Sequence, residues 1–381
     1  MDDLKNRFYC PLPFRHAFID STGISPCCQI QRQATTIDTW KDNALLKSIQ
    51  QDLLDGVIPK SCQVCSEQEE KTGQSLRLNA FQDYGKKIFV ETEIDFIDYR
   101  YSNICNFKCR SCDSVFSHGI AKETRDNPAL QKYLKLIPDK TVSMSEANSG
   151  WIIKNLPNIK RLMFTGGEPT LIPEVRSILQ HIIDNHLDHI SIMITSNGSW
   201  QDDFWFNLTR KIPNIHWTIS IDGVGESAEI IRHGTVWPRV YSNLSWLAHN
   251  SPSLDINTVV SVLNVLDLKP ILMLGREMQE KSRFPNGLHG DLGCRHQFHV
   301  SRRPYYLAAD NWPHEMRPKI ESYLDSCLDL DLDDEQRSMV SNLLSLIKTS
   351  EFDSKLWKHT LEYNRILDSI RNEDSSALFN T

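Results

Sequence analysis

The chain has 381 residues, of which 40% are hydrophobic, so it is long enough to bury one large α/β core and a smaller one. Its formal net charge is −7 and it has no long basic run, which excludes general binding to a polyanion and makes nucleic acid a poor candidate partner. No segment approaches the roughly 20 apolar residues that span a bilayer, and the first residues lack a secretory pattern, so we expect a cytoplasmic protein that does not enter a membrane. In that reducing compartment, ten cysteines indicate metal or redox chemistry rather than disulfides.

Residues 1 to 92 are irregular and contain half of the cysteines. A helical pattern falls near residues 40 to 56, and turn residues make up much of the remainder. The five thiols of this segment belong to Cys10, Cys27, Cys28, Cys62 and Cys65. They exceed the four ligands that an iron–sulfur cluster requires, so we predict a small cysteine-rich domain that a metal helps to stabilise.

From Glu93 onwards, apolar runs of strand length alternate with helical patterns, which is typical of βα units and a parallel sheet. The six expected strands lie near residues 94–102, 159–167, 189–198, 215–223, 254–264 and 296–304. We therefore predict an α/β core domain over residues 93 to 305. Residues 306 to 381 are more polar and helical, and we expect them to form a C-terminal extension that covers the open side of the core or the N-terminal domain.

Distinctive motifs follow four of these strands. They are CNFKCRSC, TGGEPT, TSNGS and SIDGVGE, in chain order. Because the reactive site of a βα fold lies at the carboxyl ends of its strands, we expect these four motifs to meet on one face.

The first motif places Cys105, Cys109 and Cys112 in a C-x3-C-x2-C pattern. Thiolates select iron–sulfur clusters, zinc or copper(I), and three thiolates leave one iron of a four-iron cluster open for another ligand. The alternative is a zinc site that combines Cys109 and Cys112 with the Cys62-x2-Cys65 pair. That alternative leaves Cys105 without a role.

This cysteine pattern at a strand end, followed by the Gly-Gly-Glu-Pro element at residues 166 to 169, resembles the radical S-adenosylmethionine (radical SAM) superfamily over about residues 93 to 305. The resemblance implies a partial (β/α)6 TIM-like barrel in which the three cysteines hold a [4Fe–4S] cluster and SAM chelates its free iron. In that family, reduction cleaves SAM to methionine and a 5′-deoxyadenosyl radical, which abstracts hydrogen from a substrate. An external reductant such as flavodoxin or ferredoxin is then implied.

The resemblance also implies residues that bind SAM or substrate. In the GGEP element, glycines allow close approach of the backbone while Glu168 faces the amino group of SAM. The full set of expected cofactor contacts is Gly166, Gly167, Glu168, Pro169, Ser196, Asn197, Ser220, Asp222, Arg232, Asn257 and Phe107. Each taken singly could instead serve a turn or a helix cap. Ser111 stands where the family commonly has an aromatic residue, so we expect Phe107 to help hold the adenine.

Two further cysteine roles follow from the resemblance. Cys294, just before the sixth strand, is a candidate hydrogen donor to a substrate radical, although a buried core cysteine is the competing interpretation. The N-terminal segment resembles the auxiliary-cluster modules called twitch and SPASM domains. We expect a second [4Fe–4S] cluster on Cys10, Cys27, Cys62 and Cys65, with Cys28 as the alternate ligand to Cys27 and structural zinc as the alternative metal.

The predicted activity is therefore hydrogen abstraction from a peptide, a protein side chain or a small metabolite such as a sugar, leading to oxidation, epimerisation or bond formation. The alternative is a protein without catalysis, either an iron–sulfur electron carrier or a zinc-stabilised interaction module.

Overall fold

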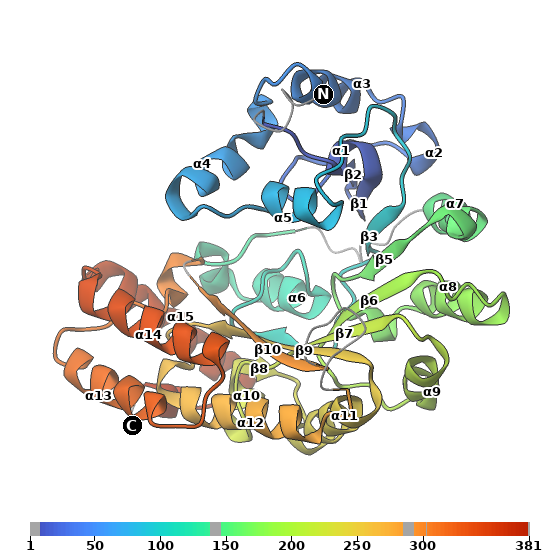
Figure 1. The fold of residues 1–381 in the computed structure, drawn as a ribbon. Helices are drawn as coiled ribbons and strands as arrows, with labels where there is room; N and C mark the ends of the chain where they lie inside the picture. The colour runs from blue at the N-terminus through green and yellow to red at the C-terminus, as the bar shows by residue number, and fades with distance from the viewer. Residues whose placement is uncertain (1–7, 138–145, 285–292, 302, 380–381) are drawn as a thin grey trace. The chain divides into compact units, whose positions relative to one another are not determined.

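The computed structural model describes residues 8–137, 146–284, 293–301 and 303–379 (Figure 1). The strands of its main sheet are β1 (His16–Asp20), β2 (Gly23–Ser25), β3 (Phe96–Arg100), β5 (Arg161–Phe164), β6 (Ser191–Ser196), β7 (Ile215–Ser220), β9 (Ser253–Val260) and β10 (Cys294–Val300). Among the described residues they follow the order β10-β9-β7-β6-β5-β3-β1-β2. The pairs β1–β3, β3–β5, β7–β9 and β9–β10 are parallel, whereas β2 runs antiparallel to β1. The expected α/β class with a mostly parallel sheet is confirmed, and the barrel remains a prediction.

All six apolar runs that predicted strands form strands, from β3 to β10. The alternating burial of their side chains explains why these segments form strands. In β7, for example, Ile215, Trp217 and Ile219 are buried and alternate with less buried residues, which is the period of a strand with one covered face.

The chain divides into two compact units. Unit 1 comprises Met1–Ser102 and Val142–Met193, and unit 2 comprises Asn103–Thr141 and Ile194–Thr381. These units differ from the division at residues 92/93 and 305/306 expected from composition, and that division remains a prediction.

Unit 1 joins the cysteine-rich segment to the first strands of the sheet. Its helices are α1 (Leu12–Arg15), α2 (Ile37–Trp40), α3 (Ala44–Leu54), η2 (Lys60–Cys62), α4 (Gln63–Thr72), α5 (Leu76–Asp83), α7 (Glu146–Asn155), η4 (Leu156–Asn158), η5 (Pro169–Leu171) and α8 (Pro173–Asp184). β1 pairs with β3 in register from His16↔Phe96 to Asp20↔Arg100. The N-terminal segment therefore adds β1 and β2 to the sheet, which its irregular pattern did not indicate.

Unit 2 contains the remaining strands, including the short β4 (Lys108–Cys109) and β8 (Arg232–His233), which pair antiparallel. Its helices are α6 (His118–Asp126), η3 (Pro128–Lys132), α9 (Asp203–Lys211), α10 (Glu226–Ile231), α11 (Trp237–Asn250), η6 (Val265–Asp267), α12 (Leu268–Lys281), η7 (Tyr305–Leu307), α13 (Arg317–Leu328), α14 (Asp334–Thr349), α15 (Ser354–Arg371) and η8 (Ser376–Leu378). One apolar core combines the end of β9 with side chains of α13, α14 and α15, among them Val260, Leu324, Leu343 and Leu367.

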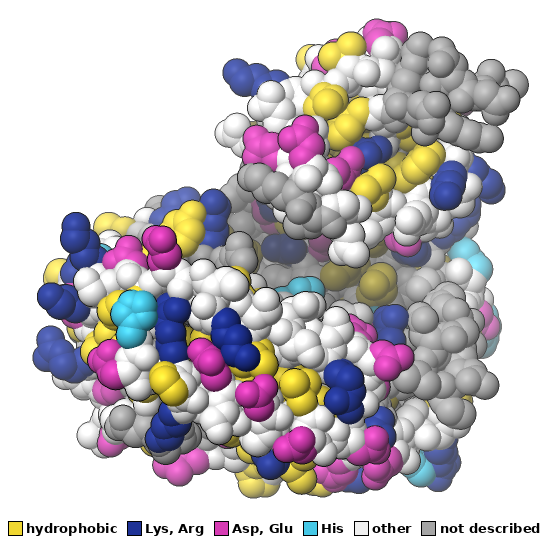
Figure 2. All heavy atoms as spheres, turned by 60° about the vertical axis from the view of Figure 1, so that its left-hand side comes forward, with side chains coloured by type: hydrophobic (Ala, Val, Ile, Leu, Met, Phe, Trp, Pro, Cys, Tyr) yellow, Lys and Arg dark blue, Asp and Glu magenta, His cyan; other side chains and the backbone are white. Residues whose placement is uncertain are grey.

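The surface of unit 2 carries mixed charge. Figure 2 shows basic and acidic side chains interspersed over the face that carries the C-terminal helices. Within the described ranges, no helix has both the length and the apolar content that a membrane span requires.

Candidate functional site

The three-cysteine loop of unit 2 is held by a short ladder of backbone hydrogen bonds. Cys109 in β4 pairs with Arg232 in β8, and the Arg110 amide donates to the Ile231 carbonyl at 2.8 Å. The side chain of Phe107, between the first two of these cysteines, is buried. The backbone of the loop is thus fixed by pairing with a segment more than 100 residues away in sequence.

The thiols of this loop lie near one another. Burial raises the pKa of the Cys112 thiol, and the neighbouring Cys109 and Cys105 thiols raise it further because like charges repel. Burial also raises the pKa of Cys109, while Arg232 acts in the opposite direction. Thiols whose pKa is raised in this way, as for Cys109 and Cys112, release their protons most readily when they bind a metal.

Arg232 provides the positive charge beside these thiols. Its Nη1 donates to Asp222 Oδ2 at 2.7 Å, and its buried Nε has no hydrogen-bond partner among the described residues. Burial acts to lower the pKa of the guanidinium, but Cys109, Asp222 and Cys105 raise it above its ordinary value. Asp222 is itself fixed, because its Oδ1 accepts a hydrogen bond from the Val259 amide at 2.9 Å. A fixed cation next to three thiolates would offset part of their charge.

One small pocket in unit 2 brings together five of the residues expected to contact the cofactor. They are Phe107, Asn197, Ser220, Asp222 and Arg232. The pocket has an empty volume of about 180 Å³, and Thr235, Trp237 and Val240 line it as well. Sequence reasoning did not identify Trp237, because a tryptophan at the start of a helix has no distinguishing pattern.

The Ser-Asn-Gly motif after β6 makes a turn and also holds the cysteine loop. Ser196 Oγ accepts from the Gly198 amide at 3.1 Å, as a turn residue does. Asn197 Nδ2 donates to Asn106 Oδ1 at 2.9 Å, and Asn106 Nδ2 donates to Ser199 Oγ at 2.8 Å. Asn106 was missed by sequence reasoning, although its place between two of the cysteines was the available indication.

Asn257 lies on β9 beside the end of β7, where it is in register with Ser220. Its Oδ1 is buried and has no hydrogen-bond partner among the described residues. A buried acceptor without a partner is costly unless a bound group satisfies it. Asn257 is therefore able to accept a hydrogen bond from a hydroxyl or an amino group of a ligand.

The Gly-Gly-Glu-Pro element belongs to unit 1. Gly166 has φ +108°, and a Cβ there would lie 3.2 Å from the Ser102 carbonyl oxygen. The Gly167 amide donates to the same oxygen at 3.1 Å. Glu168 is only 1% exposed, and its Oε1 accepts from the amide and the hydroxyl of Thr170 at 3.2 and 2.6 Å. The element therefore serves as a strand-to-helix turn, with Pro169 at the start of η5, and contact with SAM stays a prediction.

Cys294 lies at the amino end of β10, in register with Leu254 at the amino end of β9. Asp222 binds the other end of β9 at Val259, which is five residues and therefore roughly 17 Å further along the strand. The thiol is 1% exposed, and burial raises its pKa to about 12. This position is that of a core cysteine and gives no support to a role as hydrogen donor.

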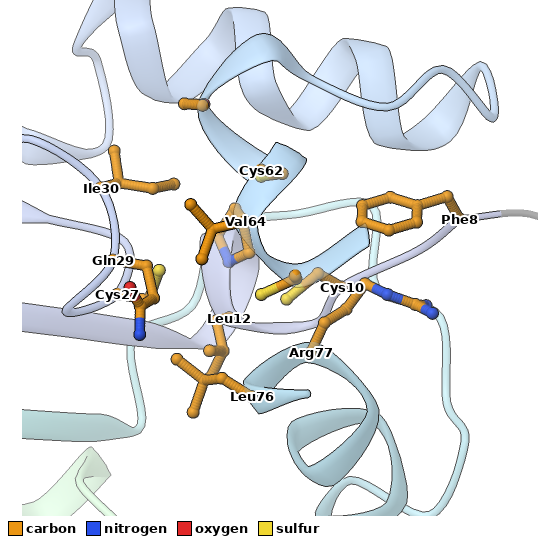
Figure 3. Close-up of a pocket in the computed structure, with 13 residues that line it drawn as sticks. Phe8, Cys10, Leu12, Cys27, Gln29, Ile30, Cys62, Val64, Leu76 and Arg77 are labelled. Carbon is orange, nitrogen blue, oxygen red and sulfur yellow. The ribbon is translucent and has the colours of Figure 1, made fainter. Parts of the chain in front are cut away.

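A second set of thiols lines a pocket of unit 1 (Figure 3). The cysteines are Cys10, Cys27, Cys62 and Cys65, and the empty volume is about 400 Å³ including the mouth. The other lining residues are mostly apolar, such as Leu12, Ile30 and Leu76. Residues 62 and 65 are about one helical turn apart at the start of α4, which places them on the same side of the helix.

The thiols of Cys27 and Cys28 differ in their burial and in their charged neighbours. Burial raises the pKa of Cys27 to about 12, with contributions from Cys28, Cys62 and Cys65. Cys28 is exposed, does not line the pocket, and interacts with Asp98 and Arg100. Within the described ranges, no three His, Cys, Asp or Glu side chains are arranged so that they could hold a single metal ion.

Comparisons with known proteins found structural similarity alone. No protein-family model matches the chain, and no curated protein matches it significantly. The solved structure of anSMEcpe with bound AdoMet is 16% identical with a TM-score of 0.38, and the match covers 60% of this chain and 57% of that one. Streptococcus suis SuiB bound to its precursor peptide SuiA is 12% identical with a TM-score of 0.40, covering 70% and 60% of the two chains. TYW1 with a lysine-pyruvate adduct is 16% identical with a TM-score of 0.31, covering 58% and 70%. TM-scores of this size do not establish a common fold.

Proposed function

We propose that the chain is a radical SAM enzyme, in which Cys105, Cys109 and Cys112 hold a [4Fe–4S] cluster and SAM occupies the open iron. The observation that supports this most directly is the group of three thiols beside Arg232 and the pocket lined with Phe107 and Asp222. When bound and reduced, the cluster would cleave SAM to methionine and the 5′-deoxyadenosyl radical that abstracts hydrogen from a substrate.

The residues of the chain would prepare this site. Arg232 would offset the charge of the thiolates, and Asp222 would fix the orientation of Arg232. Asn106 and Asn197 would keep the loop in one conformation through their amide pair. Asn257 would supply an acceptor for a polar group of SAM or of the substrate. Phe107 and Trp237 both line the pocket, and Phe107 would contact the adenine.

We propose that the pocket of Cys10, Cys27, Cys62 and Cys65 holds an auxiliary [4Fe–4S] cluster, with Cys27 rather than Cys28 as ligand. The mutual effects of these thiols on each other's pKa support a shared site, since such coupling requires proximity. An auxiliary cluster could accept an electron from a substrate radical or bind the substrate. The alternative metal is zinc.

The proposed substrate is a peptide, a protein side chain or a small metabolite, and an external flavodoxin or ferredoxin would supply the electron. The reaction outcome, whether oxidation, epimerisation or bond formation, depends on side chains that contact the substrate.

Comparing metabolites and peptides from cells with the wild-type chain and with Cys112→Ala would identify the product, because the true product would be absent from the variant.

One anaerobic experiment tests both clusters. Reconstituted protein is reduced with dithionite in the presence of SAM, and 5′-deoxyadenosine, iron and zinc are measured. We expect about eight irons in the wild type, and about four in Cys112→Ala and in Cys62→Ala. Cys112→Ala should form no 5′-deoxyadenosine, whereas Cys62→Ala should still form it.

Cys28→Ala is the matched control, because this thiol is exposed and lies outside the pocket. It should keep both the iron content and SAM cleavage. Absence of 5′-deoxyadenosine from the wild type would instead favour a non-catalytic electron carrier. One zinc per chain that is lost in Cys62→Ala would contradict the auxiliary iron–sulfur cluster.

A further inference from the structure

Arg110, between the second and third cysteines of the loop, is anchored by the C-terminal part of the chain. Its side chain is 0% exposed. Nε donates to the Ile230 carbonyl at 3.0 Å, and Nη1 donates to Asn364 Oδ1 at 3.0 Å. Nη2 donates to Asp368 Oδ1 at 2.5 Å and to Glu373 Oε2 at 2.7 Å. The two carboxylates neutralise a cation that would otherwise be costly to bury.

The same C-terminal segment makes two further contacts with the loop and one with β8. The Tyr363 hydroxyl of α15 donates to the Arg110 carbonyl at 2.8 Å. Glu373 also binds His233 Nδ1, so it connects Arg110 to the strand β8 that pairs with the loop. Cys112 packs against the apolar core that contains Tyr363.

A second ion-pair group ties α15 to the other side of Cys109. Arg371, near the end of α15, is almost fully buried and donates to Glu123 at 2.8 Å. Glu123 in turn binds Lys108 of the loop. The residues before and after Cys109 are therefore both connected to α15, one through α6 and one directly.

We infer that α15 and Glu373 form a positioning element of the cluster site, which sets the conformation of the cysteine loop before any cluster binds. This inference rests on the proposed function of the loop. The loop is also held by the hydrogen bonds of Asn106 with Asn197 and Ser199 and by the short β4–β8 pairing, which by itself is too small to be stable. The positions of the thiols consequently depend on residues about 260 positions away in sequence.

The test compares Glu373→Gln with Glu362→Gln in the metal-free protein. Glu362 is the matched control because it also belongs to the C-terminal segment, on α15, and pairs with Lys132 at the surface. Alkylation of Cys105 and Cys112 by iodoacetamide is followed by mass spectrometry. We expect both thiols to react about tenfold faster in Glu373→Gln and at the wild-type rate in Glu362→Gln, because only the first variant leaves Arg110 partly unpaired.

Tyr363→Phe provides a milder variant, since it removes one hydroxyl and keeps the ring. It should accelerate alkylation to a smaller extent, with an unchanged circular dichroism spectrum. After reconstitution, Glu373→Gln should lose about four irons per chain, and its electron paramagnetic resonance spectrum should lack the signal of the loop cluster.

Equal alkylation rates in all variants with intact helical content would overturn the inference. Equal acceleration in Glu362→Gln and Glu373→Gln would do so too, because the effect would then be general destabilisation. If the wild type binds no cluster on this loop, the proposed function fails. The alkylation rates of the metal-free protein would still test the positioning role separately.

Discussion

At the scale of single residues, the cysteine loop depends on one glycine opposite it. Gly234, directly after β8, has φ +104°. A Cβ at this position would lie 2.7 Å from the Asn106 carbonyl oxygen and 3.1 Å from the Phe107 ring. Glycine is thus required both by the backbone conformation and by the close approach of the loop.

Replacement of Gly234 by alanine should therefore lower the free energy of unfolding by about 1–3 kcal/mol and displace the loop. Gly73→Ala is the matched control, because it also has a positive φ of 70° but nothing lies within 4 Å of the added Cβ. Urea unfolding would measure both variants. A loss in Gly234→Ala no larger than that in Gly73→Ala would show that the contact with the loop is unimportant.

At the scale of elements, α6 and α15 meet through a buried ion pair that responds to pH. Burial acts to raise the pKa of the Glu123 carboxyl, but its hydrogen bonds with Arg371 and Lys108 lower it below its ordinary value. A folded-state pKa below the unfolded one means that the ionised carboxylate favours the folded state. This contribution is fully present above the unfolded pKa of about 4.3 and is lost as the pH falls through the folded pKa.

Glu123→Gln should consequently be less stable than the wild type at pH 7, and the difference should shrink as the pH falls below about 4. Urea unfolding of both proteins between pH 3 and pH 7 measures this difference. A difference that stays constant over that range would contradict the assignment, because it would mean that the ionisation of Glu123 contributes nothing.

At the scale of the whole molecule, the cysteine-rich segment is built into the same sheet as the predicted core. β1 contributes five residue pairs to the edge of β3, and Phe14 and Phe18 around it are fully buried.

We therefore expect the chain beginning at residue 93 to aggregate when expressed, because it would expose the edge of β3 and the apolar surface beneath β1. Soluble yield and gel filtration would measure this, with the full-length chain as reference. A soluble product that unfolds cooperatively would instead support the boundary predicted from composition.

Several features of the fold and the candidate site could be predicted from the sequence. The six strands were predictable because a strand leaves an apolar run of its own length, and the helix beginning near Asp334 has a capping box with Asp333 and Gln336. The grouping of Cys105, Cys109 and Cys112 was predictable from their spacing. Phe107, Asp222 and Arg232 line one pocket. This was predictable because motifs at the carboxyl ends of parallel strands lie at the same edge of the sheet.

The amino-acid sequence by itself determined the six strands from β3 to β10 and the grouping of Cys105, Cys109 and Cys112, because both depend on neighbours within a few positions. The tertiary structure alone decided that Cys27 rather than Cys28 enters the pocket, that Cys294 lies at the amino end of its strand, and that Arg110 is held by Asp368 and Glu373. These outcomes depend on burial and on ion pairs between residues up to 263 positions apart. No local pattern encodes such pairs, since a charge or a thiol acquires its partner only when the chain packs.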